Sequence, residues 1–267
     1  MKLYIKAFSS YRSDTEDIDI KKELKQTYKK DTRRKDAFIH LAMFGAQRLQ
    51  DKITINSNDE LYMTSGVGNA EVLQRVDEYV HRQGQCIKPF DFINMLGNTT
   101  SYYVADSLNL TGKNIFQISD NFTFINSLIS IYASISSSKK NAILGSIDLI
   151  NEPQEIIKRV LGIDKDTNII SSVNYQYLTL DSHNSLAKIE FDTKIYTLNE
   201  INDYLSNIDT KIYTSNRCLH VEGVKDTAFF ETLASWVINN AILKSEDITY
   251  IDCIEDRYKI VTLKIAV

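Results

Sequence analysis

Three polar residues stand where a short strand pattern changes directly into a helix pattern. Residues 115–118 read as the end of a strand and a helix starts near Phe122, which leaves Ser119, Asp120 and Asn121 in the turn. Such a turn projects side chains into a site and points free N–H groups and the positive end of the helix dipole at it. Ser119 or Asp120 could then act in hydrolysis or acyl transfer, but the sequence assigns no histidine or second carboxylate as the base.

The four histidines offer little support for such chemistry. His40 falls within a helical pattern, His81 in the charged segment EYVHRQ and His183 in a loop-like DSHNS segment. His220 is the weak candidate for a group that lines a pocket, and a structural or exposed histidine is the alternative reading. The sequence therefore predicts no catalytic residue of its own.

The cysteines and the remaining motifs point away from cofactors. Cys86, Cys218 and Cys253 lie far apart without a CxxC pair, so we expect no disulfide framework, no metal site and a reducing cytoplasm. Asn114 follows Gly112-Lys113 where a phosphate-binding loop needs Ser or Thr, and the glycine turn at 65–69 lacks the third glycine of a dinucleotide fingerprint. We expect no bound cofactor.

The charge balance restricts the partners. With a net charge of −4 and a pI of about 5.6, the chain has no general attraction for nucleic acid, despite its 15 tyrosines. No uncharged apolar run approaches the roughly 20 residues that span a bilayer, so we predict neither a nucleic-acid nor a membrane partner. The basic run 29–35 remains open between a solvated loop and a docking site for an acidic protein.

The elements that must position these residues alternate along the chain. Short apolar runs predict strands at 2–8, 61–65, 114–118, 142–147, 174–180, 186–191 and 258–266. Apolar residues at 3–4 spacing predict helices at 36–50, 122–136 and 229–244. No linker rich in Ser, Gly or Pro divides the chain, so we expect a single α/β domain over 1–267. The helix at 122–136 is apolar on both faces and belongs inside a layered core.

Between residues 31 and 150 the sequence contains the run NMLGNTTSYYVADSLNLTGKNIFQISDNFTFINSLISIYASI and the strand NAILGSIDLI, with DTRRKDAFIHLAMFGAQRL and LYMTSGVGN upstream. These segments resemble the β-ketoacyl-acyl carrier protein synthases. The residues that match the family pattern in order are Asn94, Leu108, Leu110, Gly112, Asn114, Gly145 and Asp148. The resemblance thins after residue 150.

This resemblance implies a thiolase-like layered α-β-α-β-α fold with a reduced second half. Residues 1–150 would form the N-terminal half and 151–267 a shortened C-terminal half, in which 175–180 and 185–191 would supply strands. The family activity is acyl transfer by a cysteine thiolate, assisted by two histidines of the second half.

The family chemistry does not carry over to this chain. Aligning Gly112-Lys113-Asn114 with the family's G-P-N places Asn121 at the nucleophile position, and an amide cannot form an acyl thioester. The segment after His220 should carry the family's histidine or TAS-type motif, but those residues are replaced. We therefore expect a subunit that does not condense acyl chains itself.

Related subunits that lack the cysteine act as chain-length factors beside an active synthase. The resemblance thus implies an active ketosynthase as a heterodimeric partner and the acyl carrier protein as a further partner, in fatty-acid-like, polyketide or polyene synthesis. The helix at 122–135 and its neighbours would build the heterodimer face. An acyl-transferring or hydrolytic enzyme based on Ser119 or Asp120, and a scaffold that kept only the fold, remain as alternatives.

Overall fold

The computed structural model describes residues 1–119, 122–150, 154–161, 169–218, 220–225 and 230–266. Its strands are β1 (Lys2–Arg12), β2 (Glu60–Ser65), β3 (Asn114–Ile118), β4 (Ala142–Asp148), β5 (Ser172–Thr179), β6 (Ala187–Phe191), β7 (Lys211–Thr214), β8 (Ile248–Ile254) and β9 (Arg257–Ile265). Its helices are α1 (Ile20–Gln26), α2 (Ala37–Gln50), α3 (Ala70–Asp77) with a π-helical extension (Glu78–Arg82), α4 (Pro89–Met95), α5 (Gly97–Ser107), α6 (Thr123–Ser138), α7 (Gln154–Leu161), α8 (Leu198–Leu205) and α9 (Phe230–Lys244).

The strands form one nine-stranded sheet in the order β3-β2-β4-β5-β1-β6-β9-β8-β7. The sheet contains an internal repeat. In the first half the order from the centre outward is β1, β5, β4, β2, and in the second half the corresponding strands are β6, β9, β8 and β7. The two halves join where β1 pairs antiparallel with β6, with Leu3 opposite Ile189. In the described residues the second half lacks a counterpart of β3, which is the predicted reduction.

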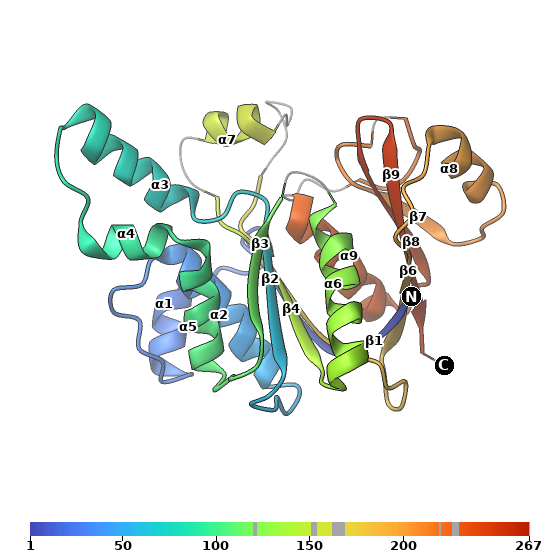
Figure 1. The fold of residues 1–267 in the computed structure, drawn as a ribbon, viewed down its shortest axis with the longest axis horizontal. Coiled ribbons are helices and arrows are strands. Elements are labelled where there is room, and N and C mark those ends of the chain that lie inside the picture. Colours follow the sequence, from blue (N-terminus) through green and yellow to red (C-terminus); the bar gives the residue numbers. More distant parts are fainter. Residues whose placement is uncertain (120–121, 151–153, 162–168, 219, 226–229, 267) are drawn as a thin grey trace.

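Three apolar clusters separate the layers, and Figure 1 shows α6 and α9 standing between the two halves of the sheet. The central cluster joins α6 and α9 to strands from both halves. The second cluster packs α2 and part of α5 on the outer face of the first half, and the third packs α8 on the outer face of the second half. This is the predicted α-β-α-β-α order.

The central position of α6 corrects one prediction. We expected the helix at 122–135 to form a heterodimer face, but its apolar side chains Phe124, Ile125, Leu128 and Ile131 are buried within the chain itself. A helix that is apolar on both sides is buried when a sheet packs on each side of it. These four side chains are therefore not available to contact a partner.

The strand predicted at 174–180 also has a different place from the expected one. We assigned it to the second half, but β5 pairs antiparallel with both β1 and β4 and thereby completes the sheet of the first half. Its side chains Asn174 and Gln176 are fully buried and donate to groups of α9. Both faces of β5 are therefore covered, and one of them carries polar residues.

At the free edge of β7, a short segment takes part of the place of the missing strand. Thr214 N–H donates to Val224 O at 3.0 Å, and Val224 N–H donates to Ile212 O at 2.9 Å. Gly223 is required by this close approach, because a Cβ there would stand 2.7 Å from Thr214 Cγ2. The reduction of the second half therefore leaves this edge partly covered.

Candidate functional site

Polar side chains gather at the edge of the sheet where the parallel strands end. Strands β2, β3 and β4 run parallel, so Ser65 and Asp148, which end β2 and β4, and Ser119, which follows β3, lie along one edge. The first turns of α6 and α9 reach the same edge. We call this edge, with its two helix starts, the candidate site.

Asp148 is the best-organised group of the site. Its fully buried carboxylate accepts from Ser65 Oγ at 3.0 Å, Gly66 N–H at 2.8 Å and Thr232 Oγ at 3.1 Å. Burial raises the pKa of Asp148 to about 6, and these donors oppose that rise because they favour the charged form. Asp148 thus connects the end of β4 to the end of β2 and to the start of α9.

The start of α6 has an unusual backbone. Phe122 precedes the helix with φ 51° and ψ 27°, a left-handed conformation that a bulky residue adopts only where the surroundings hold it there. Thr123 Oγ donates to Ser119 O at 2.9 Å and so joins the start of α6 to the residue that follows β3. Phe122 and Thr123 are both buried.

The hairpin of β8 and β9 adds two ionisable groups to this region. Asp252 and Lys259 stand opposite each other in the strand register. Their neighbours along each strand belong to the third cluster, on the outer face of the second half. Because side chains alternate along a strand, Asp252 and Lys259 lie on the opposite face, which the central helices cover. Burial raises the pKa of Asp252 to about 6, although a hydrogen bond from Ser215 and the charge of Arg217 act to lower it. Burial lowers the pKa of Lys259.

The predicted site residues are placed as follows. Ser119 lies in the turn after β3, partly buried, whereas Asp120 and Asn121 fall outside the described residues. His220 is exposed and makes no hydrogen bond or ion pair with a described residue. The structure therefore gives Ser119 no histidine from this position as a base.

The other histidine and cysteine positions are structural or peripheral. His40 is a buried core histidine whose Nε2 lies 3.0 Å from Thr32 O, and burial lowers its pKa. Cys218 and Cys253 are buried in the outer cluster of the second half, and Cys86 is exposed. Within the described part of the chain no group of His, Cys, Asp or Glu is arranged to hold a metal ion. Nor does that part contain a helix with the length and apolarity needed to cross a membrane.

Residues that carry the family resemblance mostly have structural contacts. Gly145 packs against the ring of Tyr175, and Gly112 packs against the backbone of Asn58 and Asp59, so neither position has room for a Cβ. Asn94 is buried and donates to Arg34 O at 3.2 Å. In the basic run 29–35, Lys30 Nζ donates to Ser107 O at 2.6 Å, whereas Lys29, Arg33 and Arg34 are exposed.

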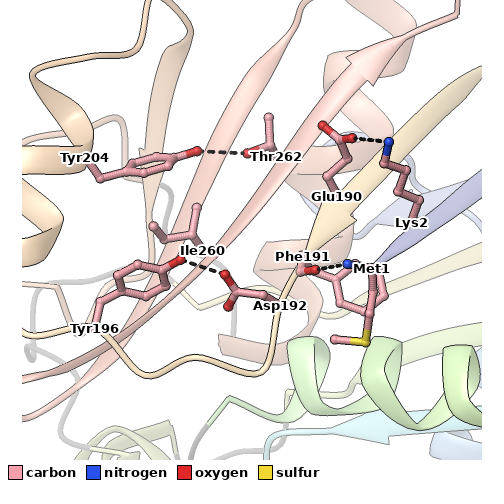
Figure 2. Close-up of a pocket in the computed structure, with 9 residues that line it drawn as sticks. All are labelled: Met1, Lys2, Glu190, Phe191, Asp192, Tyr196, Tyr204, Ile260 and Thr262. Atoms are coloured by element: carbon pink, nitrogen blue, oxygen red, sulfur yellow. Dashed lines mark hydrogen bonds and ion pairs between the residues drawn. The ribbon is translucent and has the colours of Figure 1, made fainter.

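A separate cavity of about 330 Å³ lies where the start of β1 meets β6, β9 and α8 (Figure 2). The polar groups that line it pair with one another: Tyr196 O–H donates to Asp192 at 2.6 Å, and the Tyr204 and Thr262 hydroxyls are 3.3 Å apart. The first residue donates from its amino group to Phe191 O at 2.7 Å. These pairings leave the cavity with few groups to recognise a ligand.

The sequence patterns missed Asp148, Asp252 and Lys259 as site residues. Asp148 was matched to the family only as part of a strand, and the other two sit in strand patterns where an isolated charge reads as solvent-facing. The signal that could have found them is a single charge on the apolar face of a strand.

No protein-family model and no curated protein sequence matches this chain. Solved structures do match it. The ishigamide ketosynthase/chain length factor aligns over 100% of both chains at 10% identity with a TM-score of 0.72. A β-ketoacyl synthase from Burkholderia phymatum aligns over 100% of both chains at 8% identity with a TM-score of 0.69. A ketosynthase in complex with its chain length factor from Xenorhabdus doucetiae aligns over 98% of this chain and 99% of that chain at 11% identity, with a TM-score of 0.61.

These likenesses extend over the whole or nearly the whole of this chain. The chain therefore has the thiolase-like fold of the β-ketoacyl synthases, with a reduced second half.

Proposed function

We propose that this chain is a non-catalytic, chain-length-factor-like subunit that pairs with an active ketosynthase in fatty-acid-like, polyketide or polyene synthesis. Two of the solved structures with this fold contain a ketosynthase together with a chain length factor. The turn that would hold the nucleophile reads Ser-Asp-Asn-Phe, so the reactive thiolate would come from the partner. The acyl carrier protein would deliver the acyl chain to that partner.

The observation that carries the proposal is the free edge of β3. This strand ends the sheet and pairs only with β2 among the described segments. Figure 1 shows it at the rim of the first half, between α5 and α6. An edge strand presents unpaired N–H and C=O groups, which invite pairing with a strand of another chain.

The side chains around this edge are apolar. Ile115 and Ile118 on β3 are 37% and 51% exposed, and Leu96, directly before α5, is 44% exposed. Gly97 lies against the Phe116 ring, which places Leu96 beside the strand. Ile115 and Ile118 lie on opposite faces of β3, because side chains alternate along a strand. We call Leu96, Ile115 and Ile118, which flank this edge on its two sides, the β3 patch. The neighbouring helices α4 and α5 add the exposed side chains Phe92, Ile93 and Tyr102.

An apolar patch of this kind on a free sheet edge is typical of an interface between proteins. The large apolar side chains of α6, such as Phe124, Leu128 and Ile131, are by contrast buried in the core. The occupant that we propose for the β3 patch is the matching edge of the ketosynthase subunit, because a partner with the same fold has a strand at the same position of its own sheet.

The test is co-expression with candidate ketosynthases that carry the cysteine, followed by size-exclusion chromatography with mass determination and an acyl-loading assay. We expect a one-to-one complex in which only the partner becomes acylated. The double variant Ile115→Lys/Ile118→Lys should abolish the complex, because two buried charges without counter-ions would oppose it.

The matched control is Leu243→Lys on α9, where an equally apolar side chain is 66% exposed away from β3. It should leave the complex intact. If this chain alone becomes acylated and Ser119→Ala abolishes the acylation, the chain is an enzyme and the proposal is wrong. Failure of every cysteine-containing candidate to form a complex would contradict it as well.

A further inference from the structure

Lys259 on β9 has an environment that an ordinary surface lysine does not have. Its side chain lies on the face of the hairpin that the central helices cover, and the residue is only 7% exposed. Lys259 Nζ donates to Asn126 Oδ1 on the first turns of α6 at 2.9 Å, and it lies 5.7 Å from the centre of the Phe122 ring. A buried ammonium group is costly unless it is paired with an opposite charge.

No described carboxylate neutralises this ammonium group. Asp252 faces Lys259 across the hairpin, but no ion pair joins the two side chains among the described residues. Asp192 acts on Lys259 only at longer range and already accepts a hydrogen bond from Tyr196. The positive end of the α6 dipole lies close by and adds to the unbalanced charge.

The donors in this cluster remain available. An ammonium group has three N–H bonds, of which one goes to Asn126 Oδ1. That bond fixes the orientation of the Asn126 amide, because an ammonium group can only donate. The Asn126 Nδ2 group therefore points its N–H bonds elsewhere, and no described residue accepts them. Asn126 is half-exposed, so solvent reaches this point.

We propose that Lys259 and Asn126 bind the carboxylate group of a small-molecule ligand at the start of α6. The ammonium group would donate to one carboxylate oxygen and the Asn126 amide to the other, a two-point match to a planar anion. The bound anion would supply a counter-charge that the described residues lack, and the Phe122 ring would contact the apolar part of the ligand. This site goes beyond the proposed pairing with a ketosynthase and does not depend on it.

The experiment uses the full chain with hexanoate as the probe and hexanamide as its neutral counterpart. Binding is measured by titration calorimetry, and the Lys259 amine is followed by NMR through its ¹³Cε signal in protein with ¹³C-labelled lysine. We expect saturable binding of hexanoate alone. We also expect the pKa of Lys259 to rise on binding, because an adjacent anion favours the charged form.

Variants decide whether the binding occurs at this site. Lys259→Met should weaken hexanoate binding at least tenfold, Asn126→Asp should weaken it by charge repulsion, and Lys259→Arg should retain most of it. Lys264→Met is the control, because Lys264 lies on the same strand and is exposed. Equal binding of hexanamide, equal binding by Lys259→Met, or no saturable binding by the unaltered chain would each overturn the proposal. None of these results concerns the β3 patch, so the two proposals fail separately.

Discussion

The Asp148 carboxylate accepts a hydrogen bond of 3.1 Å from the Thr232 hydroxyl, 84 positions further along the chain. The bond joins the end of β4 in the first half to the start of α9, the helix that precedes β8 in the second half. Ser146 and Ser235 continue the connection one turn deeper, with their hydroxyls 2.6 Å apart. A polar seam of this kind fixes how the two halves of a layered core sit on each other.

Replacing Asp148 by Asn should flatten the pH dependence of stability between about pH 4 and 6. The pKa of Asp148 is raised to about 6 in the fold, so its contribution to stability is complete below the unfolded value near 4 and falls as the pH rises through 6. Two pKa units correspond to about 3 kcal/mol. Urea unfolding at a series of pH values measures the slope.

The control is Asp106→Asn, which removes an exposed carboxylate on α5 and should leave that slope unchanged. Asp252 has a pKa raised in the same direction, so part of the dependence should survive in Asp148→Asn. An unaltered slope in Asp148→Asn would show that its carboxyl is not the group that titrates.

Gly45→Ala should destabilise the protein by about 1–3 kcal/mol through overpacking. A Cβ at this position of α2 would stand 2.6 Å from Val173 Cγ2 and 2.9 Å from the Tyr175 ring. The second change Val173→Ala removes the nearer atom, so the double variant should lose less than the sum of the two single losses. Chemical denaturation of the four proteins tests this, and strict additivity would contradict the close contact.

A thiol reagent should modify one cysteine of the native protein and three after unfolding. Cys86 is exposed, whereas Cys218 and Cys253 are buried. Contact with Cys253 and burial raise the pKa of the Cys218 thiol, which keeps it in the unreactive form. Cys86→Ser should abolish native labelling, as counted by intact mass, and rapid native labelling of two or three sites would be inconsistent with the packing around α8.

Lys259→Met should raise the free energy of unfolding at pH 7 by about 1 kcal/mol, because it replaces an uncompensated buried charge by an apolar side chain of similar length. The pKa of Lys259 is lowered in the fold. The unfolded chain therefore binds more protons at alkaline pH, and the stability of the unaltered protein gains from this group as the pH rises towards 10. The variant should lack that gain.

Thermal unfolding at pH 7 and pH 10 measures both effects. Lys264→Met on the exposed side of the same strand should change stability by less than about 0.5 kcal/mol. A Lys259→Met variant that is less stable than the unaltered protein at pH 7 would mean that the ammonium group is well compensated.

Local patterns in the sequence were sufficient for the elements that cover the core. The strand at 114–118 and the helices at 36–50, 122–136 and 229–244 appear in the structure with boundaries shifted by two residues or fewer. Apolar spacing reports on burial within one element, and these elements are long or strongly periodic. The strands β7 and β8 were missed, because four residues are too short to show a period and Asp252 interrupts an apolar run.

The placement of the functional groups depended on the tertiary structure alone. The two apolar faces of α6 determined that it lies inside a layered core, but only the packing of both half-sheets around it excluded those faces from a partner surface. The sequence pattern predicts that Lys259 faces solvent in an alternating strand. In the fold its ammonium group instead donates to Asn126, 133 positions away. Periodicity is set by chain neighbours, whereas a charge is buried or paired by residues that only folding brings together.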